Sequence, residues 1–191
     1  ILKNKSGLLV NPSQLNDKWF TDRKPFDPLN IKLLYIGRIK IEKGVYSLIK
    51  ILKKIDDKFS LSIINSEMFY DKKLENDKIK IFHFKNENDS IMKFYDDHNI
   101  FILPSFTEAH PQVLDEALSR LRPVIVFSEI SHVKRDREGV FVCKRDHKSL
   151  LDTIKYIIKN YKDIEKKMSN NKLPTKNIFL RDLTQIINEK N

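Results

Sequence analysis

The stretch "IKLLYIGRIKIEKGVYSLIKILKKIDDKFSLSIIN", residues 31–65, contains two different hydrophobic periods in succession. Its two ends, "IKLLYIG" and "FSLSIIN", are short apolar runs of the kind found in buried strands. Between them, apolar residues recur at helical spacing: Val45, Leu48, Ile49, Leu52 and Ile55. A strand, a helix and a second strand in this order predict a βαβ unit of a parallel sheet.

The same alternation continues along the chain. Further apolar runs, "IKIFHF", "IFILPS", "PVIVF" and "GVFVC", predict four more strands. Helical patterns are expected in "NENDSIMKFYDDHN" (86–99), in the stretch that follows Pro111, and in "HKSLLDTIKYIIKNYKDIEKKM" (147–168) as one long helix. We therefore expect a doubly wound, Rossmann-like α/β domain with a parallel sheet over residues 31–172.

The regions outside this domain have a different pattern. Residues 1–30 contain Pro12, Pro25 and Pro28 and no βα alternation, so we interpret them as an interdomain connecting segment. The first residues, "ILKNKSGLLVNP", lack an initiator Met, and we expect a longer protein before Ile1. Residues 173–191 are interpreted as the end of a polar linker and a terminal helix.

Composition excludes some classes of protein. Of the 191 residues, 40% are hydrophobic, and no apolar run approaches the roughly 18 residues of a membrane helix. The single cysteine, Cys143, cannot form an internal disulfide, which favours a reducing compartment such as the cytoplasm. The formal net charge of +10 would attract phosphates, anionic lipids or nucleic acid. Because the lysines are scattered and no recognition motif accompanies them, we do not expect a nucleic-acid partner.

The first chemical motif is "YIGRIKIEKG", residues 35–44, where an expected strand ends and a helix begins. Gly37 permits close approach of the backbone, and Arg38 and Lys43 place two cations beside the helix N-terminus. This combination suits a diphosphate without a metal ion. The alternative is a turn glycine with solvated cations. The stretch lacks the dinucleotide and Walker fingerprints.

The second motif is "TEAHPQVLDEALSRLRPVIVF", residues 107–127. Pro111 suits the first turn of a helix, which puts Glu108 at the helix mouth and Glu116 inside the helix. Carboxylates accept hydrogen bonds from sugar hydroxyls. The spacing therefore suits a sugar nucleotide, with a hexose near Glu108, the ribose near Glu116 and the diphosphate between them on the helix N-terminus.

Each acidic residue also has a simpler interpretation. Glu116 and Arg120 are four residues apart and could form an exposed helix ion pair. Glu108 could merely stabilise the helix dipole. His110 and His132 could border the site or be ordinary surface histidines, and no two histidines have metal-ligand spacing.

Taken together, "GRIKIEKG", "LPSFTEAHPQVLDEAL" and "RPVIV" resemble the donor-binding half of the retaining glycosyltransferases of group 1, also called family 4. The resemblance spans approximately residues 33–160 and includes a G-R-x4-K-G loop and an E-x7-E motif. It implies a GT-B architecture of two Rossmann-like domains, of which this chain is similar to the C-terminal one.

The resemblance also implies roles for individual residues. Arg38, Lys43 and Glu108 would be catalytic: the cations would hold the diphosphate and stabilise the leaving nucleotide, and Glu108 would contact the transferred sugar. Glu116 would bind the ribose. The substrate site would further include Gly37, Ala109, His110, Gln112 and Val113, with backbone amides contacting sugar and phosphate.

The expected partners follow from the same resemblance. They are a nucleotide-sugar donor, an acceptor-binding domain before Ile1, a glycan or lipid-linked acceptor, and a membrane surface contacted peripherally; no cofactor or metal ion is required. Departures from the family pattern are Ala109 and Leu121 where glycines are usual, and "FSEISHV" in place of a Gly-Gly loop. They leave open an inactive nucleotide-sugar-binding module, or a sugar-nucleotide epimerase on the same fold.

Overall fold

Six short strands form one parallel sheet in the computed structural model of the chain, which describes residues 13, 15–27, 30–55, 59–67, 70–83 and 91–188. The strands are β1 (Lys32–Ile36), β2 (Ser60–Asn65), β3 (Ile79–His83), β4 (Ile100–Leu103), β5 (Val124–Phe127) and β6 (Val140–Cys143). Their order is β3-β2-β1-β4-β5-β6, and every neighbouring pair is parallel. The expected doubly wound, Rossmann-like α/β sheet is confirmed.

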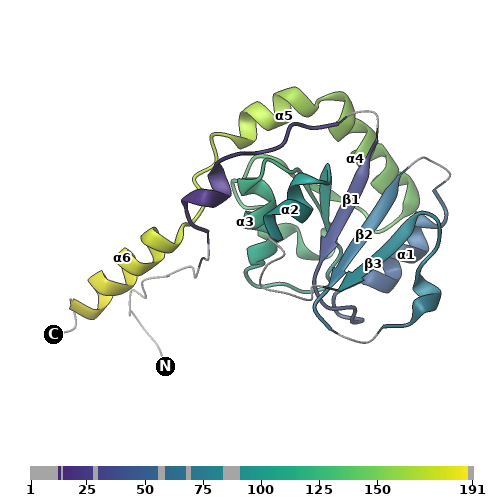
Figure 1. Cartoon of the computed structure of the whole chain (residues 1–191), viewed down its shortest axis with the longest axis horizontal. Coiled ribbons are helices and arrows are strands. Elements are labelled where there is room, and N and C mark those ends of the chain that lie inside the picture. Colours follow the sequence, from purple (N-terminus) through teal and green to yellow (C-terminus); the bar gives the residue numbers. More distant parts are fainter. Residues whose placement is uncertain are drawn as a thin grey trace.

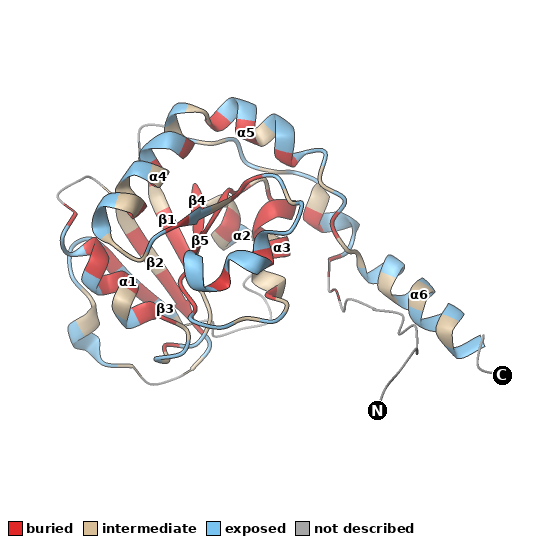
Figure 2. Cartoon of the chain, turned by 180° about the vertical axis from the view of Figure 1, so that it is seen from behind, coloured by how far each residue is buried: buried red, intermediate tan, exposed pale blue. Residues whose placement is uncertain are grey.

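Helices cover both faces of this sheet, which is why its strands are so apolar. In Figure 1, α2 (Ile91–Asp96) and α3 (Gln112–Ser119) lie on one side, and α1 (Val45–Leu52) and α4 (His147–Lys159) on the other. β4 and β5 are consequently buried along their whole length (Figure 2). In the edge strand β3, Ile79 and Ile81 are buried while Lys80 and Phe82 are exposed.

The expected apolar stripe is confirmed: Val45, Leu48, Ile49 and Leu52 are buried in α1, and Ile55 is buried just after the helix ends. The helix expected over residues 86–99 ends earlier than predicted, at Asp96, and residues 86–90 lie outside the described residues. Short 3₁₀ helices complete the fold: η1 (Asp17–Phe20), η2 (Lys72–Leu74) and η3 (Ser128–Lys134).

The expected single helix over residues 147–168 is wrong. The structure divides it into α4 and α5 (Tyr161–Met168), with Asn160 between them at φ −110° and ψ 17°. The Asn160 side chain donates to the carbonyl of Tyr156 at 2.8 Å, so it satisfies a backbone group at the end of α4. Asparagine competes with helical hydrogen bonding in this way, which explains the break.

The segment before the sheet packs onto the α/β domain. Leu15 and Trp19 are buried in the common core. Arg120, at the end of α3, is 2% exposed and donates to the backbone carbonyls of Lys18, Trp19, Thr21 and Asp22. Part of the expected connecting segment is therefore held by hydrogen bonds from a buried side chain.

Helix α3 ends in a Schellman motif without glycine. The amide of Arg122 donates to the Ala117 carbonyl and that of Leu121 to the Leu118 carbonyl, at 2.9 and 3.0 Å. Leu121 has a φ of +55°, in the left-handed region that favours glycine. The backbone therefore keeps the conformation of the usual glycine although leucine occupies the position.

The last helix, α6 (Lys176–Asn188), extends away from the body of the domain (Figures 1 and 2). Four of its apolar residues are exposed: Ile178, Leu180, Leu183 and Ile187. Its start is held by a hydrogen bond from the amide of Lys176 to the Leu15 carbonyl, at 2.7 Å. None of the residues that the structure describes in α6 is buried.

Candidate functional site

The two sequence motifs meet at the centre of the sheet. The strand order changes direction between β1 and β4, and the carboxyl ends of these neighbours are where doubly wound folds bind ligands. The loop after β1 contains residues 37–44, and the loop after β4 contains residues 104–111. A hydrogen bond from the Phe106 amide to the Glu42 carbonyl, at 3.0 Å, joins the two loops.

Lys43 and Glu108 are in direct contact at this junction. The Lys43 ammonium donates to Glu108 Oε1 at 2.7 Å, and the Ser105 hydroxyl donates to the same oxygen at 2.7 Å. Both side chains are shielded, with exposed fractions of 26% for Lys43 and 12% for Glu108. The two residues therefore lie on one edge of the sheet, as their motifs predict, but they are paired with each other instead of standing apart.

Gly44 allows the loops to approach so closely. It has a φ of +68°, and a Cβ at this position would lie 1.8 Å from the carbonyl oxygen of Pro104. Because that neighbour is backbone, a side chain here would push apart the two loops that hold Lys43 and Glu108. The close approach of the two loops therefore explains why the first motif ends in a glycine.

Arg38 lies on the same loop with its side chain exposed. Its backbone carbonyl accepts a hydrogen bond from the hydroxyl of Tyr35, at 2.8 Å. Burial raises the pKa of Tyr35, so the hydroxyl stays protonated and remains a donor. Within the described part of the chain, the guanidinium of Arg38 forms no ion pair. Gly37, with a φ of +152°, precedes it at the strand end.

Two helix N-termini face this edge without side-chain caps. The N-cap residues are Gly44 for α1 and Pro111 for α3, and neither provides a side-chain hydrogen bond. By contrast, Asp146 caps α4 by accepting from the amide of Ser149 at 2.8 Å. Uncapped N–H groups and the helix dipole both favour an anion.

The start of α3 differs slightly from the expectation. Pro111 was expected as the first helical residue, but it is the N-cap, with an extended ψ of 104°, and the helix begins at Gln112. Ala109 is exposed, whereas His110, Gln112 and Val113 are half-buried. Ala109 does not have a positive φ, so this backbone does not require the glycine usual in the family.

Glu116 has a partner that its sequence neighbours do not indicate. Its Oε2 accepts a hydrogen bond from the hydroxyl of Tyr95 in α2, at 2.7 Å. Burial raises the pKa of Glu116, and the hydrogen bond from Tyr95 opposes that shift. The alternative ion pair with Arg120 is wrong, because Arg120 donates to both carboxylate oxygens of Asp96, at 2.9 and 2.8 Å.

Arg145, in the loop after β6, is a further residue of this edge. Its guanidinium lies over the rings of Phe106 and Phe127, at 4.0 and 4.3 Å from their centroids. It donates to the Ser47 hydroxyl and to the carbonyls of Pro104 and Ser105, at 2.8, 2.8 and 3.1 Å. Arg145 therefore fixes the loop that contains Glu108. Its position directly after a strand indicates a residue at this edge of the sheet. No spacing in the sequence, however, indicates that it contacts Phe106, Phe127 or the loop after β4.

The two histidines near the second motif have different surroundings. His132 Nε2 lies 2.8 Å from the backbone carbonyl of Glu108, so this histidine borders the site. His110 Nε2 lies 3.6 Å from Asp115 Oδ2, and Arg137 lies 3.0 Å from the other oxygen of Asp115. Burial raises the pKa of Asp115 and lowers that of His110. His110, Asp115 and Arg137 therefore form a cluster of their own, separate from the Lys43–Glu108 pair.

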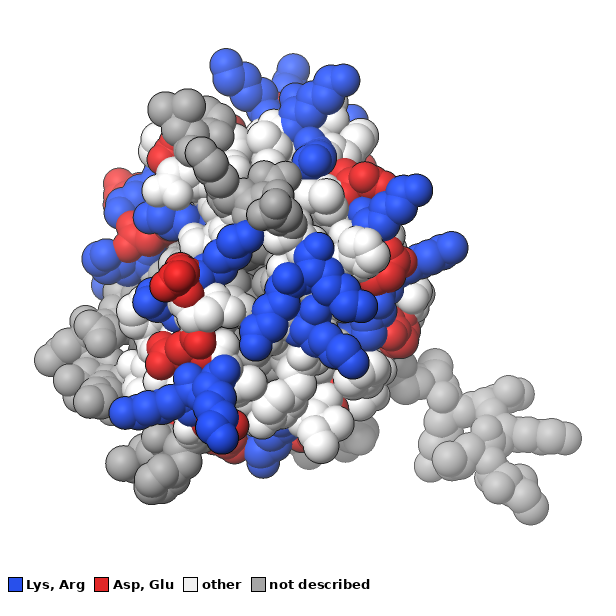
Figure 3. Space-filling view, turned by 90° about the vertical axis from the view of Figure 1, so that its right-hand side faces the viewer, with Lys and Arg blue, Asp and Glu red and all other residues white. Residues whose placement is uncertain are grey.

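The described part of the chain shows neither a metal-binding group nor a membrane-spanning helix. On the face shown in Figure 3, lysine and arginine side chains lie among acidic and uncharged ones. Across the described ranges, no three or more His, Cys, Asp or Glu residues are grouped as they would be to hold a metal ion. Nor does any described helix combine the length and the apolar character needed to cross a bilayer.

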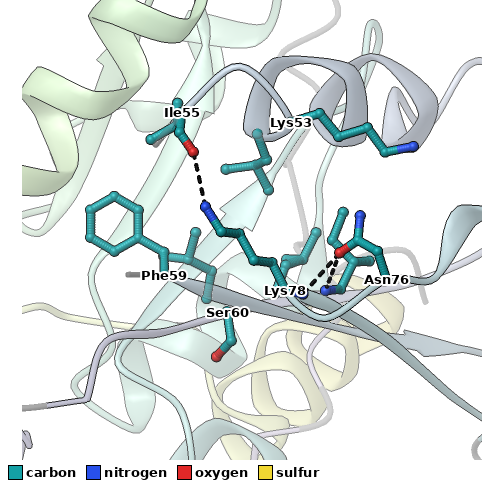
Figure 4. A pocket seen from close by; sticks show the side chains of 10 residues that line it. Lys53, Ile55, Phe59, Ser60, Asn76 and Lys78 are labelled. Carbon is teal, nitrogen blue, oxygen red and sulfur yellow. Dashed lines mark hydrogen bonds between the residues drawn. The ribbon is translucent and has the colours of Figure 1, made fainter. Parts of the chain in front are cut away.

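A small cavity lies at the opposite edge of the sheet (Figure 4). It has a volume of ≈ 30 Å³ and is lined by the first residues of β1, β2 and β3 and by the end of α1. Lys78 extends past it to donate to the Ile55 carbonyl at 3.2 Å. The cavity has room for about one or two water molecules, so it cannot hold a nucleotide.

Comparison with known proteins agrees with this architecture. The family model described as "Glycosyl transferases group 1" matches residues 17–173. No curated protein matches the chain. Among solved structures, sucrose-phosphate synthase from Thermosynechococcus elongatus is similar with 16% identity and a TM-score of 0.72, over 93% of this chain and 51% of that one.

Two further structures show the same fold. A glycosyltransferase from Rickettsia africae has 19% identity and a TM-score of 0.67, over 93% of this chain and 55% of that one. HepE from Anabaena, in complex with UDP and glucose, has 17% identity and a TM-score of 0.62, over 84% of this chain and 48% of that one. The chain spans about half the length of these proteins. Because the family model covers most of its residues, the chain belongs to the group 1 glycosyl transferases, and its fold is that of the C-terminal half of a GT-B enzyme.

Proposed function

We propose that this chain is the donor-binding half of a retaining, metal-independent glycosyltransferase that transfers a hexosyl group from a nucleoside-diphosphate sugar to a glycan or lipid-linked acceptor. One observation supports this most directly. The Lys43–Glu108 pair lies at the centre of the sheet edge, beside two helix N-termini without side-chain caps. A cation, a carboxylate and free amides at one point suit a ligand that is both anionic and rich in hydroxyls.

In this proposal the cations bind the diphosphate. Of the three N–H donors of the Lys43 ammonium, one is engaged by Glu108, so the others can reach a phosphate. Arg38 is exposed on the same loop and can add a two-pronged contact. Negative charge develops on the leaving nucleotide as the glycosidic bond breaks, and fixed cations stabilise it without a metal ion.

The carboxylates contact the sugars. Glu108 binds the transferred hexose through its second oxygen, since Oε1 already accepts from Lys43 and Ser105. Glu116 binds the ribose. Amides near the start of α3, at Ala109, His110, Gln112 and Val113, contact sugar and phosphate, whereas Pro111 has no N–H to donate.

The HepE structures contain UDP with glucose and UDP-glucose, which makes UDP-sugars the first donors to test. The acceptor-binding domain would form the other half of the enzyme. The whole enzyme would be cytoplasmic and would contact a membrane surface peripherally. The exposed apolar face of α6 supports docking of that domain here. A longer form of the protein should then protect α6 from hydrogen exchange.

Isothermal titration with UDP, GDP, ADP, CMP and their sugars tests the donor site. We expect one nucleoside diphosphate to bind, equally well with EDTA or with Mg²⁺. Arg38→Ala should weaken binding of the diphosphate more than that of the monophosphate, because only the former extends to the loop after β1. Lys144→Ala is the matched control, an exposed cation just after β6 on the same edge.

Two results would count against the donor site. One is the absence of binding by every nucleotide, and the other is an equal loss in both variants. Retention is checked separately, by the anomeric configuration of the product made by a form with both domains.

The second candidate is a catalytically inactive nucleotide-sugar-binding module. It is favoured by "FSEISHV" where the family usually has a Gly-Gly loop, since η3 occupies that stretch. The module would bind the donor tightly but neither hydrolyse nor transfer it, even in a form with both domains. Measured turnover of the bound donor would exclude it.

A further inference from the structure

Tyr95 is the most completely buried polar side chain near the proposed ribose site. It lies in α2 with an exposed fraction of 0%. Its ring contacts Trp19 edge-on at 5.9 Å between centroids and Phe101 at 5.7 Å. Its backbone carbonyl accepts from the Nε of the buried Arg122 at 2.9 Å. The hydroxyl is therefore held at a fixed point by a packed ring and an anchored backbone.

That hydroxyl has one strong acceptor. It donates to Glu116 Oε2 at 2.7 Å and lies 3.4 Å from the Val113 carbonyl. Burial raises the pKa of Tyr95 well above its ordinary value, so the group stays a donor at any physiological pH. Among the residues that the structure describes, none donates to the other carboxylate oxygen of Glu116, Oε1.

We infer that Tyr95 is a positioning residue for ribose recognition: by holding Oε2 of Glu116, it orients Oε1 to accept hydrogen bonds from the ribose hydroxyls of the bound nucleotide. The inference rests on the proposed function, because it requires a nucleotide donor at this edge. The inference also predicts a specificity. The chain should bind ribonucleotides more tightly than nucleotides that lack the 2′ and 3′ hydroxyls, and Tyr95 should determine how large this difference in affinity is.

A second consequence does not depend on any ligand. Burial disfavours the charged form of Glu116, while the hydrogen bond from Tyr95 favours it. An ionised carboxylate is a stronger acceptor for a hydroxyl than a protonated one. Tyr95 therefore also keeps Glu116 in the form suited to the ribose.

The test compares Tyr95→Phe with Tyr161→Phe. Each change removes one buried hydroxyl and keeps the ring; the hydroxyl of Tyr161 donates to the Leu121 carbonyl at 3.0 Å and does not contact Glu116. Binding is measured for UDP, GDP and ADP, and the tightest of them is compared with its 2′,3′-dideoxy analogue. The readout is the ratio of the two dissociation constants in each protein.

We expect the wild type to prefer the ribonucleotide by about 10-fold or more, as hydrogen bonds to a charged group allow. Tyr95→Phe should reduce this ratio severalfold, whereas Tyr161→Phe should leave it unchanged. A purely structural role of Tyr95 would weaken both nucleotides equally and keep the ratio. If Tyr95→Phe still binds the nucleotide and the ratio is unchanged, this inference is overturned but the proposed function is not.

The other outcomes are distinct. If no nucleotide binds the wild type, the proposed function fails, and this inference with it. If the wild type binds but shows no ribose preference, the ribose role of Glu116 is overturned. Titration of Glu116 by NMR in the free protein is the independent readout: the pKa should be higher in Tyr95→Phe than in the wild type, and equal values contradict the positioning role.

Discussion

At the scale of single residues, Glu116 is an acidic side chain whose ionised form is disfavoured by burial. Its pKa is raised mainly by burial, so the folded state binds the proton more tightly than the unfolded state does. Binding of this proton stabilises the folded state in full at pH values below the ordinary Glu pKa of 4.5. The contribution is lost as the pH rises through the raised pKa of the folded state. A ligand-binding role would explain why the charge is retained.

The substitution Glu116→Gln tests this cost. Gln removes the charge yet can still accept from Tyr95, so wild type should lose stability relative to the variant as the pH rises above 4.5. Urea unfolding at a series of pH values measures the difference. The exposed Glu138→Gln is the control and should differ from wild type by a constant small amount. A difference for Glu116→Gln that does not change with pH would contradict the expectation.

At the scale of elements, the end of α3 shows how a fold keeps a conformation when the residue suited to it has changed. Leu121 occupies the left-handed position of the Schellman motif, and its side chain packs against the core. A non-glycine residue in this conformation costs about 1–2 kcal/mol. Packing of the leucine offsets part of this cost, which explains how the turn persists.

A pair of variants separates the two contributions. Leu121→Ala and Leu121→Gly both remove the packed side chain, but only glycine relieves the left-handed backbone. Leu121→Gly should therefore be more stable than Leu121→Ala by about 1 kcal/mol. Thermal or urea unfolding of the two proteins measures the difference, and equal stability would show that the turn is not strained.

At the scale of the whole molecule, Arg120 joins three parts of the chain. It pairs with Asp96 at the end of α2, lies at the end of α3, and donates to carbonyls of the segment before the sheet. The side chains of Arg120 and Asp96 are 2% and 11% exposed, so this ion pair is largely shielded from water. Removing one partner of a buried pair leaves the others unsatisfied.

Arg120→Met keeps the aliphatic bulk and removes the donors. We expect it to lower the free energy of unfolding by about 3–5 kcal/mol. Arg181→Met, which removes an exposed α6 ion pair with Asp182, should change it by less than about 1 kcal/mol. Protease cleavage near residues 15–27 should rise in the first variant only. Comparable losses in the two variants would contradict the joining role of Arg120.

The sequence by itself determined the strands, their parallel alternation with helices, and the sheet edge at which Lys43 and Glu108 would meet. These features follow from local periods and from a rule of topology: parallel strands bring their carboxyl ends to one edge. The sequence shows that Gly44 ends the first motif, but only the structure shows that a Cβ there would lie 1.8 Å from the Pro104 carbonyl oxygen.

Only the tertiary structure decided which side chains become partners. Spacing suggested Arg120 for Glu116, yet the packed core brings Tyr95 to Glu116 and Asp96 to Arg120. It likewise brings Arg145 to Phe106 and Phe127. The physical reason is that helical periodicity states which face a residue occupies, whereas its partner depends on which distant element packs on that face, and long-range packing leaves no local period in the chain.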